Sequence, residues 1–151
     1  MKRGRQRGIA AVELALLLTG SLLIVPCMLL FGRVFWEYTV LQKAVHDGTR
    51  YLASIPASDM TNASAYFAAR AAARHIVLDA IVAGGLAALP DPELIQVACV
   101  PNCGSAALPD TIRLTVDLSV SDAQYGDSFT GAFLPPDGFV ISANVTMRYG
   151  N

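Results

Sequence analysis

The chain has 151 residues, of which 54% are hydrophobic and 15% are charged. This length corresponds to one ordinary domain, and the composition excludes both a wholly disordered chain and a multidomain enzyme. Four of the eleven Lys and Arg residues fall within the first seven positions, so residues 9–151 carry seven basic against twelve acidic side chains, a net charge of −5. An acidic body that has no basic cluster excludes a general nucleic-acid-binding protein.

A long apolar run follows the basic tip. It extends from Ile9 to Phe35, and the 19 residues Leu14–Gly32 carry no charge. A hydrocarbon core of about 30 Å needs roughly 20 helical residues, so the run predicts a single transmembrane helix. The positive-inside bias predicts a cytoplasmic N-terminus, with the chain exported from about residue 36 onward. A cleavable secretory signal is the weaker alternative, because the run exceeds a typical h-region and no A-x-A-like site closely follows it.

One acidic residue, Glu13, lies near the start of this run. A carboxylate that faces lipid costs about 2–3 kcal/mol or more, so Glu13 is a candidate functional residue unless its side chain reaches back to the cytoplasmic interface. Its setting is specific: a short basic leader ends at Gly8, the apolar Ile9 follows, and Glu13 comes five positions after Gly8. This arrangement looks like a prepilin-type processing site.

With these residues the chain resembles the type IV pilin superfamily, and more closely the TadE-like minor pseudopilins of the Tad (Flp-type) pilus system. The resemblance implies that a membrane prepilin peptidase removes residues 1–8 by cutting between Gly8 and Ile9. It also implies the other Tad pilins and pseudopilins and the inner-membrane assembly platform as partners, in biogenesis of an adhesion pilus. Leu14 departs from the aromatic residue usual after the Glu. Further matching stretches are Phe31–Phe35, Leu41–Ala44, Asp47–Tyr51 and Ala143–Tyr149.

Elementary chemistry supports a role for Glu13 in assembly. A cut after Gly8 leaves a cationic amine on Ile9, about one helical turn from Glu13. In a bundle of such helices, the Glu13 carboxylate of one copy is expected to pair with the Ile9 amine of a neighbour, which removes the cost of an unpaired ion in lipid.

The rest of the chain divides at Pro56. Because no proline occurs between Pro26 and Pro56, we predict one helix over residues 9–55, about 70 Å long, which is kinked at Pro26 and continues beyond the membrane as a stalk. Residues 56–151 are predicted to form an exported head that begins with a second helix, capped by Asp59 or Thr61 and ending near Gly84. The predicted buried stripe of this helix is Ala63, Tyr66, Ala69, Ala73, Ile76 and Ala80.

Three later segments have the period of β-strands. Apolar and polar residues alternate over Ile112–Val120 and again over Phe139–Arg148, and a shorter strand is expected over Leu94–Val100. With a helix packed on its apolar face, this predicts a three- to four-stranded antiparallel sheet in a small α+β head.

The sequence offers little chemistry for catalysis. Cys99 and Cys103 lie on the predicted exported side and flank a Pro-Asn turn, which favours a disulfide. A zinc site is disfavoured because no second ligand pair accompanies them, with Cys27 in the membrane segment and His46 and His75 far off in sequence. No catalytic motif is present, so we expect neither enzymatic activity nor a cofactor. The alternatives to a pseudopilin are an unprocessed single-pass anchor that presents a binding domain and a membrane-tethered hydrolase.

Overall fold

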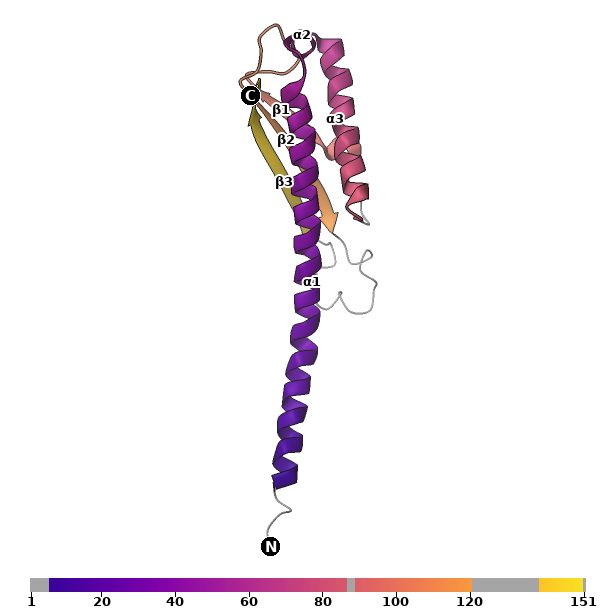
Figure 1. Cartoon of the computed structure of the whole chain (residues 1–151), viewed down its shortest axis with the longest axis vertical. Helices are drawn as coiled ribbons and strands as arrows, with labels where there is room; N and C mark the ends of the chain where they lie inside the picture. Colours follow the sequence, from indigo (N-terminus) through magenta and orange to yellow (C-terminus); the bar gives the residue numbers. More distant parts are fainter. Residues whose placement is uncertain (1–5, 87–88, 121–138, 151) are drawn as a thin grey trace. The chain divides into compact units, whose positions relative to one another are not determined.

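The computed structural model describes residues 6–86, 89–120 and 139–150 (Figure 1). The chain forms two compact units, Met1–Trp36 and Glu37–Asn151, and we call the second the head unit. The first helix, α1 (Gln6–Ser54), contributes to both units and continues through Pro26. Its end at Ser54 agrees with the predicted end near residue 55.

The second predicted helix is split in two. A short helix, α2 (Ala57–Thr61), precedes α3 (Ala63–Ala83). The expected caps Asp59 and Thr61 are wrong for α3, because the side-chain oxygen of Asn62 accepts from the backbone N–H groups of Ser64 and Ala65. An N-cap residue satisfies N–H groups that have no partner inside the helix, which is why the break falls at an Asn.

The buried stripe of α3 is only partly as predicted. Tyr66, Ala69 and Ala73 are buried, but the stripe continues through Val77 and Ile81 rather than Ile76 and Ala80. Steps of four residues keep these last positions on the face that meets α1 and the sheet. Ala63 is exposed at the first turn.

Within the described residues, three antiparallel strands form one sheet in the order β1-β2-β3, with bounds β1 (Gln96–Val100), β2 (Thr111–Val120) and β3 (Phe139–Arg148). The α+β fold class is therefore confirmed. The alternation is also confirmed: Ile112, Leu114, Val116, Leu118 and Val120 are buried, and their neighbours on β2 are exposed or half-buried. The first strand begins later than expected because Pro92–Leu94 form a 3₁₀ turn, η1.

The core of the head unit lies between the sheet, α3 and the last turns of α1 (Figure 1). A Cβ added at Gly48 of α1 would meet Val77 of α3 at 2.5 Å and Leu114 of β2 at 3.4 Å. One added at Gly84 would collide with the Val40 side chain of α1. These glycines let the helix backbones approach closely, so residues 37–54 of α1 pack with α3 and the sheet in the head unit.

The end of the chain closes over the end of α1. The Tyr149 hydroxyl donates to the Ile55 carbonyl at 2.8 Å, and the Gly150 N–H donates to the Ala53 carbonyl at 3.4 Å. The last carbonyls of a helix have no partner within the helix, so these contacts satisfy groups that would otherwise need water.

Candidate assembly surface

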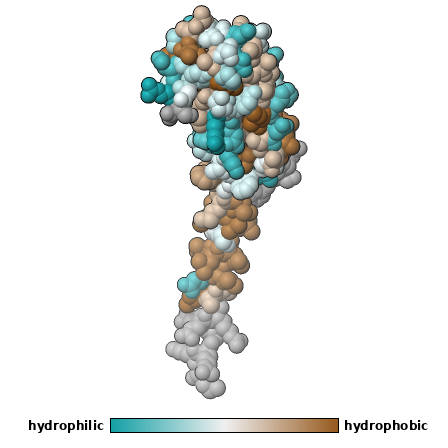
Figure 2. Space-filling view, turned by 45° about the horizontal axis from the view of Figure 1, so that its top comes forward, coloured by the Kyte–Doolittle hydropathy of each residue, from teal (hydrophilic) through white to brown (hydrophobic). Residues whose placement is uncertain are grey.

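The first unit exposes a continuous apolar surface. From Ile9 to Val25 every side chain of α1 is exposed, including Leu16 at 72% and Leu22 at 74% of its full area. Figure 2 shows the mostly hydrophobic colour of this helical segment on the face in view. Within the described residues, one helix is long and apolar enough to cross a membrane, over Ile9–Ser54, and none of its most apolar window is buried in the chain. Such a surface requires lipid or another protein as its neighbour.

Glu13 lies within this surface. It borders a shallow hollow on the side of α1 together with Ile9, Val12 and Leu16. These side chains share one face because their spacings of three and four residues match a helical turn. No ion pair joins Glu13 to another side chain in the part of the chain that the structure describes. The carboxylate is therefore open to a partner from outside the chain.

The predicted processing site is helical in the structure. Gly8 and Ile9 both lie in the first turns of α1, and the helix continues from them to Glu13 without a break. The four-residue step from Ile9 to Glu13 thus spans about one turn, as the sequence predicts. The preceding leader residues 1–5 lie outside the described residues.

Two hydroxyl groups on the apolar surface are bonded within the helix itself. The Thr19 hydroxyl donates to the Ala15 carbonyl at 2.8 Å, and the Ser21 hydroxyl donates to the Leu18 carbonyl at 2.9 Å. Gly20 lies between them, and a Cβ added there would meet nothing within 4 Å. Hydroxyls satisfied in this way carry little cost in lipid, and the glycine leaves room for a close helix neighbour.

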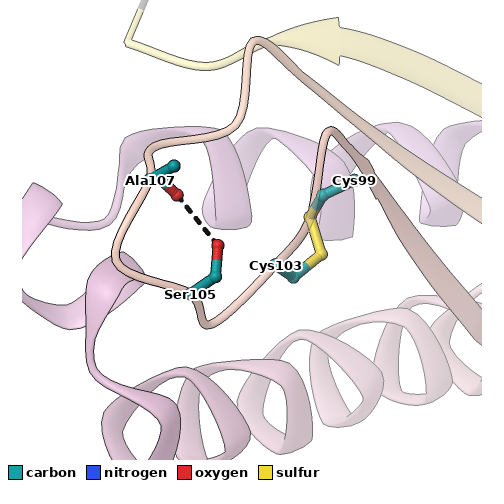
Figure 3. The surroundings of a disulfide bond; sticks show 4 residues. All are labelled: Cys99, Cys103, Ser105 and Ala107. Carbon is teal, nitrogen blue, oxygen red and sulfur yellow. Dashed lines mark hydrogen bonds between the residues drawn. A yellow bond between two sulfur atoms is a disulfide. The ribbon is translucent and has the colours of Figure 1, made fainter.

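A disulfide joins Cys99 at the end of β1 to Cys103 in the loop that follows, across a Cα–Cα distance of 5.2 Å (Figure 3). In the same loop the Ser105 hydroxyl donates to the Ala107 carbonyl at 3.2 Å. Gly104, with φ of +64°, lies against the Tyr66 ring of α3, where an added Cβ would come to 3.0 Å. The bridge thus braces a loop that packs on α3.

The histidines and the free cysteine of the described residues lie apart from one another. His46 and His75 are exposed on separate helices, Cys27 is a free thiol on α1, and no group of three or more potential metal ligands occurs there. Burial raises the pKa of the Tyr66 phenol, while the positive charges of Arg70 and Arg74 act in the opposite direction. Arg74 itself donates to the Ile95 carbonyl through both Nε and Nη2.

Residues 8–50 match the TadE-like protein family. Over these residues the chain is TadE-like. The TadE-like region covers less than a third of the sequence, and it contains Gly8, Ile9, Glu13 and the whole apolar surface. No curated protein and no solved structure matches the chain. The stretch Ala143–Tyr149 lies outside the TadE-like region, although it was expected from the sequence to resemble the family.

The TadE-like region and its apolar helix together connect the chain with the Tad pilus and with membrane anchoring. The sequence predicts that Gly8, Ile9 and Glu13 are neighbours on one helix, and all three lie in α1. The sequence did not predict that Gly48 and Gly84 lie at close contacts between α1 and α3, or that Tyr149 contacts the end of α1. Only the isolated glycines in a helical pattern gave any signal for these contacts.

Proposed function

We propose that the chain is a non-enzymatic minor pseudopilin that is cut by a prepilin peptidase between Gly8 and Ile9 and assembles through α1 during biogenesis of a Tad-type adhesion pilus. The observation that carries this proposal is the single carboxylate, Glu13, in a continuous exposed apolar surface within the TadE-like region. A simple anchor needs an apolar helix but has no use for an acid within it.

Processing converts the helix into an assembly-competent form. Before the cut, Lys2, Arg3, Arg5 and Arg7 hold the tip in the cytoplasm, and Ile9 has no free amine. After the cut, the Ile9 amine pairs with Glu13 of a neighbouring helix and fixes the register between copies or between different pilins. The pairing is favourable because each charge would be costly alone in lipid.

The proposed function also implies a location and a set of partners. The chain is a single-pass protein of the bacterial inner membrane, its N-terminus is cytoplasmic, and its head is periplasmic until the subunit enters the pilus. The peptidase, the other Tad pilins and pseudopilins and the inner-membrane assembly platform are its partners. The disulfide between Cys99 and Cys103 supports an exported head, because oxidising compartments maintain such bonds.

The N-terminal residue and intact mass of the membrane-extracted chain test the proposal. The chain is expressed with and without a prepilin peptidase, and we expect a peptidase-dependent start at Ile9. Gly8→Leu should keep its leader even with the peptidase, whereas the matched change Ala10→Leu should still be cut. An intact leader in every sample would remove the pairing amine and favour the unprocessed anchor that presents a binding domain.

A further inference from the structure

The head unit has a surface hollow of about 490 Å³, lined by residues from the end of α1, from α2 and from α3. Its lining includes Tyr51 and Ser54 of α1, Asp59 of α2, and Ala65 and Ala68 of α3.

The wall on α3 consists of small side chains. Ala65, Ala68 and Ala69 have only methyl side chains, so this part of the lining is apolar. Ala68 and Ser54 are exposed at its mouth, which leaves the hollow open to solvent. An aliphatic stem placed there would exchange water for methyl contacts.

Asp59 gives the hollow a negative charge. Its side chain is half-buried and accepts a long hydrogen bond of 3.3 Å from the neighbouring Ser58 hydroxyl. Among the described residues, no Lys or Arg forms an ion pair with it. Its charge also contributes, after burial, to the raised pKa of Tyr149. The carboxylate is therefore available to a cation that enters from outside.

The head unit has a net negative charge. Residues 37–151 contain six Lys and Arg against eleven Asp and Glu, a net charge of −5. A field of this sign raises the local concentration of cationic groups and speeds their encounter with the surface. The Tyr51 ring at the wall of the hollow adds a surface on which a cation is stabilised by the electrons of the ring.

We propose that this hollow binds a cationic side chain, lysine or arginine, presented by a partner polypeptide. The aliphatic stem lies on the alanines of α3, and the cation is placed between the Asp59 carboxylate and the Tyr51 ring. The site is made entirely by the head unit, so the inference is independent of processing at Gly8 and of assembly through Glu13.

Methyl NMR of the full chain in lipid nanodiscs, with ¹³C-labelled alanine methyls, tests this inference. The probes are the N-acetyl methylamides of lysine, arginine and norleucine, because norleucine has the lysine stem without its charge. We expect saturable shifts at Ala65, Ala68 and Ala69 with the lysine or the arginine probe, and much weaker shifts with norleucine.

Two variants test the two halves of the site. Asp59→Asn should weaken binding of the cationic probe by roughly fivefold or more, as for loss of one partly shielded charge pair. Ala68→Leu should block the stem without changing any charge. The matched controls are Asp79→Asn and Ala71→Leu, which change exposed residues of α3 that do not line the hollow and should bind as the unchanged chain does.

Three results would overturn the inference: no saturable shift with either cationic probe, equal shifts with norleucine, or undiminished binding by Asp59→Asn. The methyl spectrum of each variant without probe shows whether the head has folded. If Asp59→Asn misfolds, Ala68→Leu alone decides the question, and undiminished binding by a folded Ala68→Leu also rejects the site.

Discussion

At the scale of single residues, Tyr149 has a clear structural role. Its hydroxyl donates to the Ile55 carbonyl just beyond the end of α1, a residue 94 positions earlier in the chain. Tyr149→Phe removes this hydrogen bond and leaves the Ile55 carbonyl without its donor. We therefore expect the free energy of unfolding of the head to fall by about 0.5–1.5 kcal/mol. Chemical denaturation of the full chain in detergent measures the change.

Tyr38→Phe is the control, because it loses only an exposed hydrogen bond from Gln42 within one helix and should cost at most about 0.5 kcal/mol. Equal losses in the two variants would contradict this role.

The same phenol gives a pH dependence of known sign. Burial, and then the Asp59 charge, raise the pKa of Tyr149 above its ordinary value of 10.0. The folded chain therefore holds this proton more tightly than the unfolded chain, and the stabilisation is complete below the unfolded pKa and is lost as pH rises through the folded one. We expect the stability difference between the unchanged chain and Tyr149→Phe to be constant near neutral pH and to shrink above about pH 10. Denaturation curves across this range measure the difference, and one that grows with pH would show that the sign is wrong.

At the scale of elements, the crossing of α1 and α3 depends on Gly48. Alanine there would gain about 1 kcal/mol in helix propensity, but its Cβ would lie 2.5 Å from Val77 Cγ2. Because overpacking a core costs typically 1–3 kcal/mol, we expect Gly48→Ala to destabilise the head despite the better helix former. Thermal unfolding of the full chain provides the measurement. Gly20→Ala, where an added Cβ meets nothing within 4 Å, should leave the head unchanged, and Gly48→Ala combined with Val77→Ala should lose less than the two single changes together. A Gly48→Ala chain as stable as the original would refute the close approach.

The elements also show what the sequence can predict. The two long strands were predictable because their burial alternates with a period of two residues. The apolar helix was predictable because its apolar run is long enough to cross a membrane. The cap at Asn62 was missed because Asp59 and Thr61 are equally good capping residues, and only the short α2 decides between them. Val77 and Ile81 were missed because an Ala-rich helix offers several similar faces, and the choice depends on its neighbours. The hollow beside Asp59 is lined by residues of three different helices, so no local sequence pattern predicts it.

At the scale of the whole molecule, the exposed apolar surface and the packed core of the head belong to different units of the chain. Glu13 lies in the first unit on an exposed face of α1, whereas the core residues of the head all follow Glu37. Distant and independent sites make additive contributions to stability, so Glu13→Leu should change the unfolding free energy of the head by less than about 0.5 kcal/mol. This separation makes Glu13 a clean test of assembly.

The proposed pairing of Glu13 with the Ile9 amine of a neighbour predicts the effect of the same substitution on assembly. Glu13→Leu should still yield a chain that begins at Ile9 and remains in the membrane, since the change makes the helix more apolar. It should lose co-purification with other Tad pilins, because the neighbouring amine then has no partner in lipid. Glu13→Asp keeps the charge on a shorter side chain and should retain part of the association, whereas Leu16→Ala, on the same face, should have little effect. Mass spectrometry of the membrane-extracted complex measures both cutting and association. If a processed Glu13→Leu chain associates normally with the other Tad pilins, the apolar surface alone directs assembly and the Glu13 carboxylate is not needed for it.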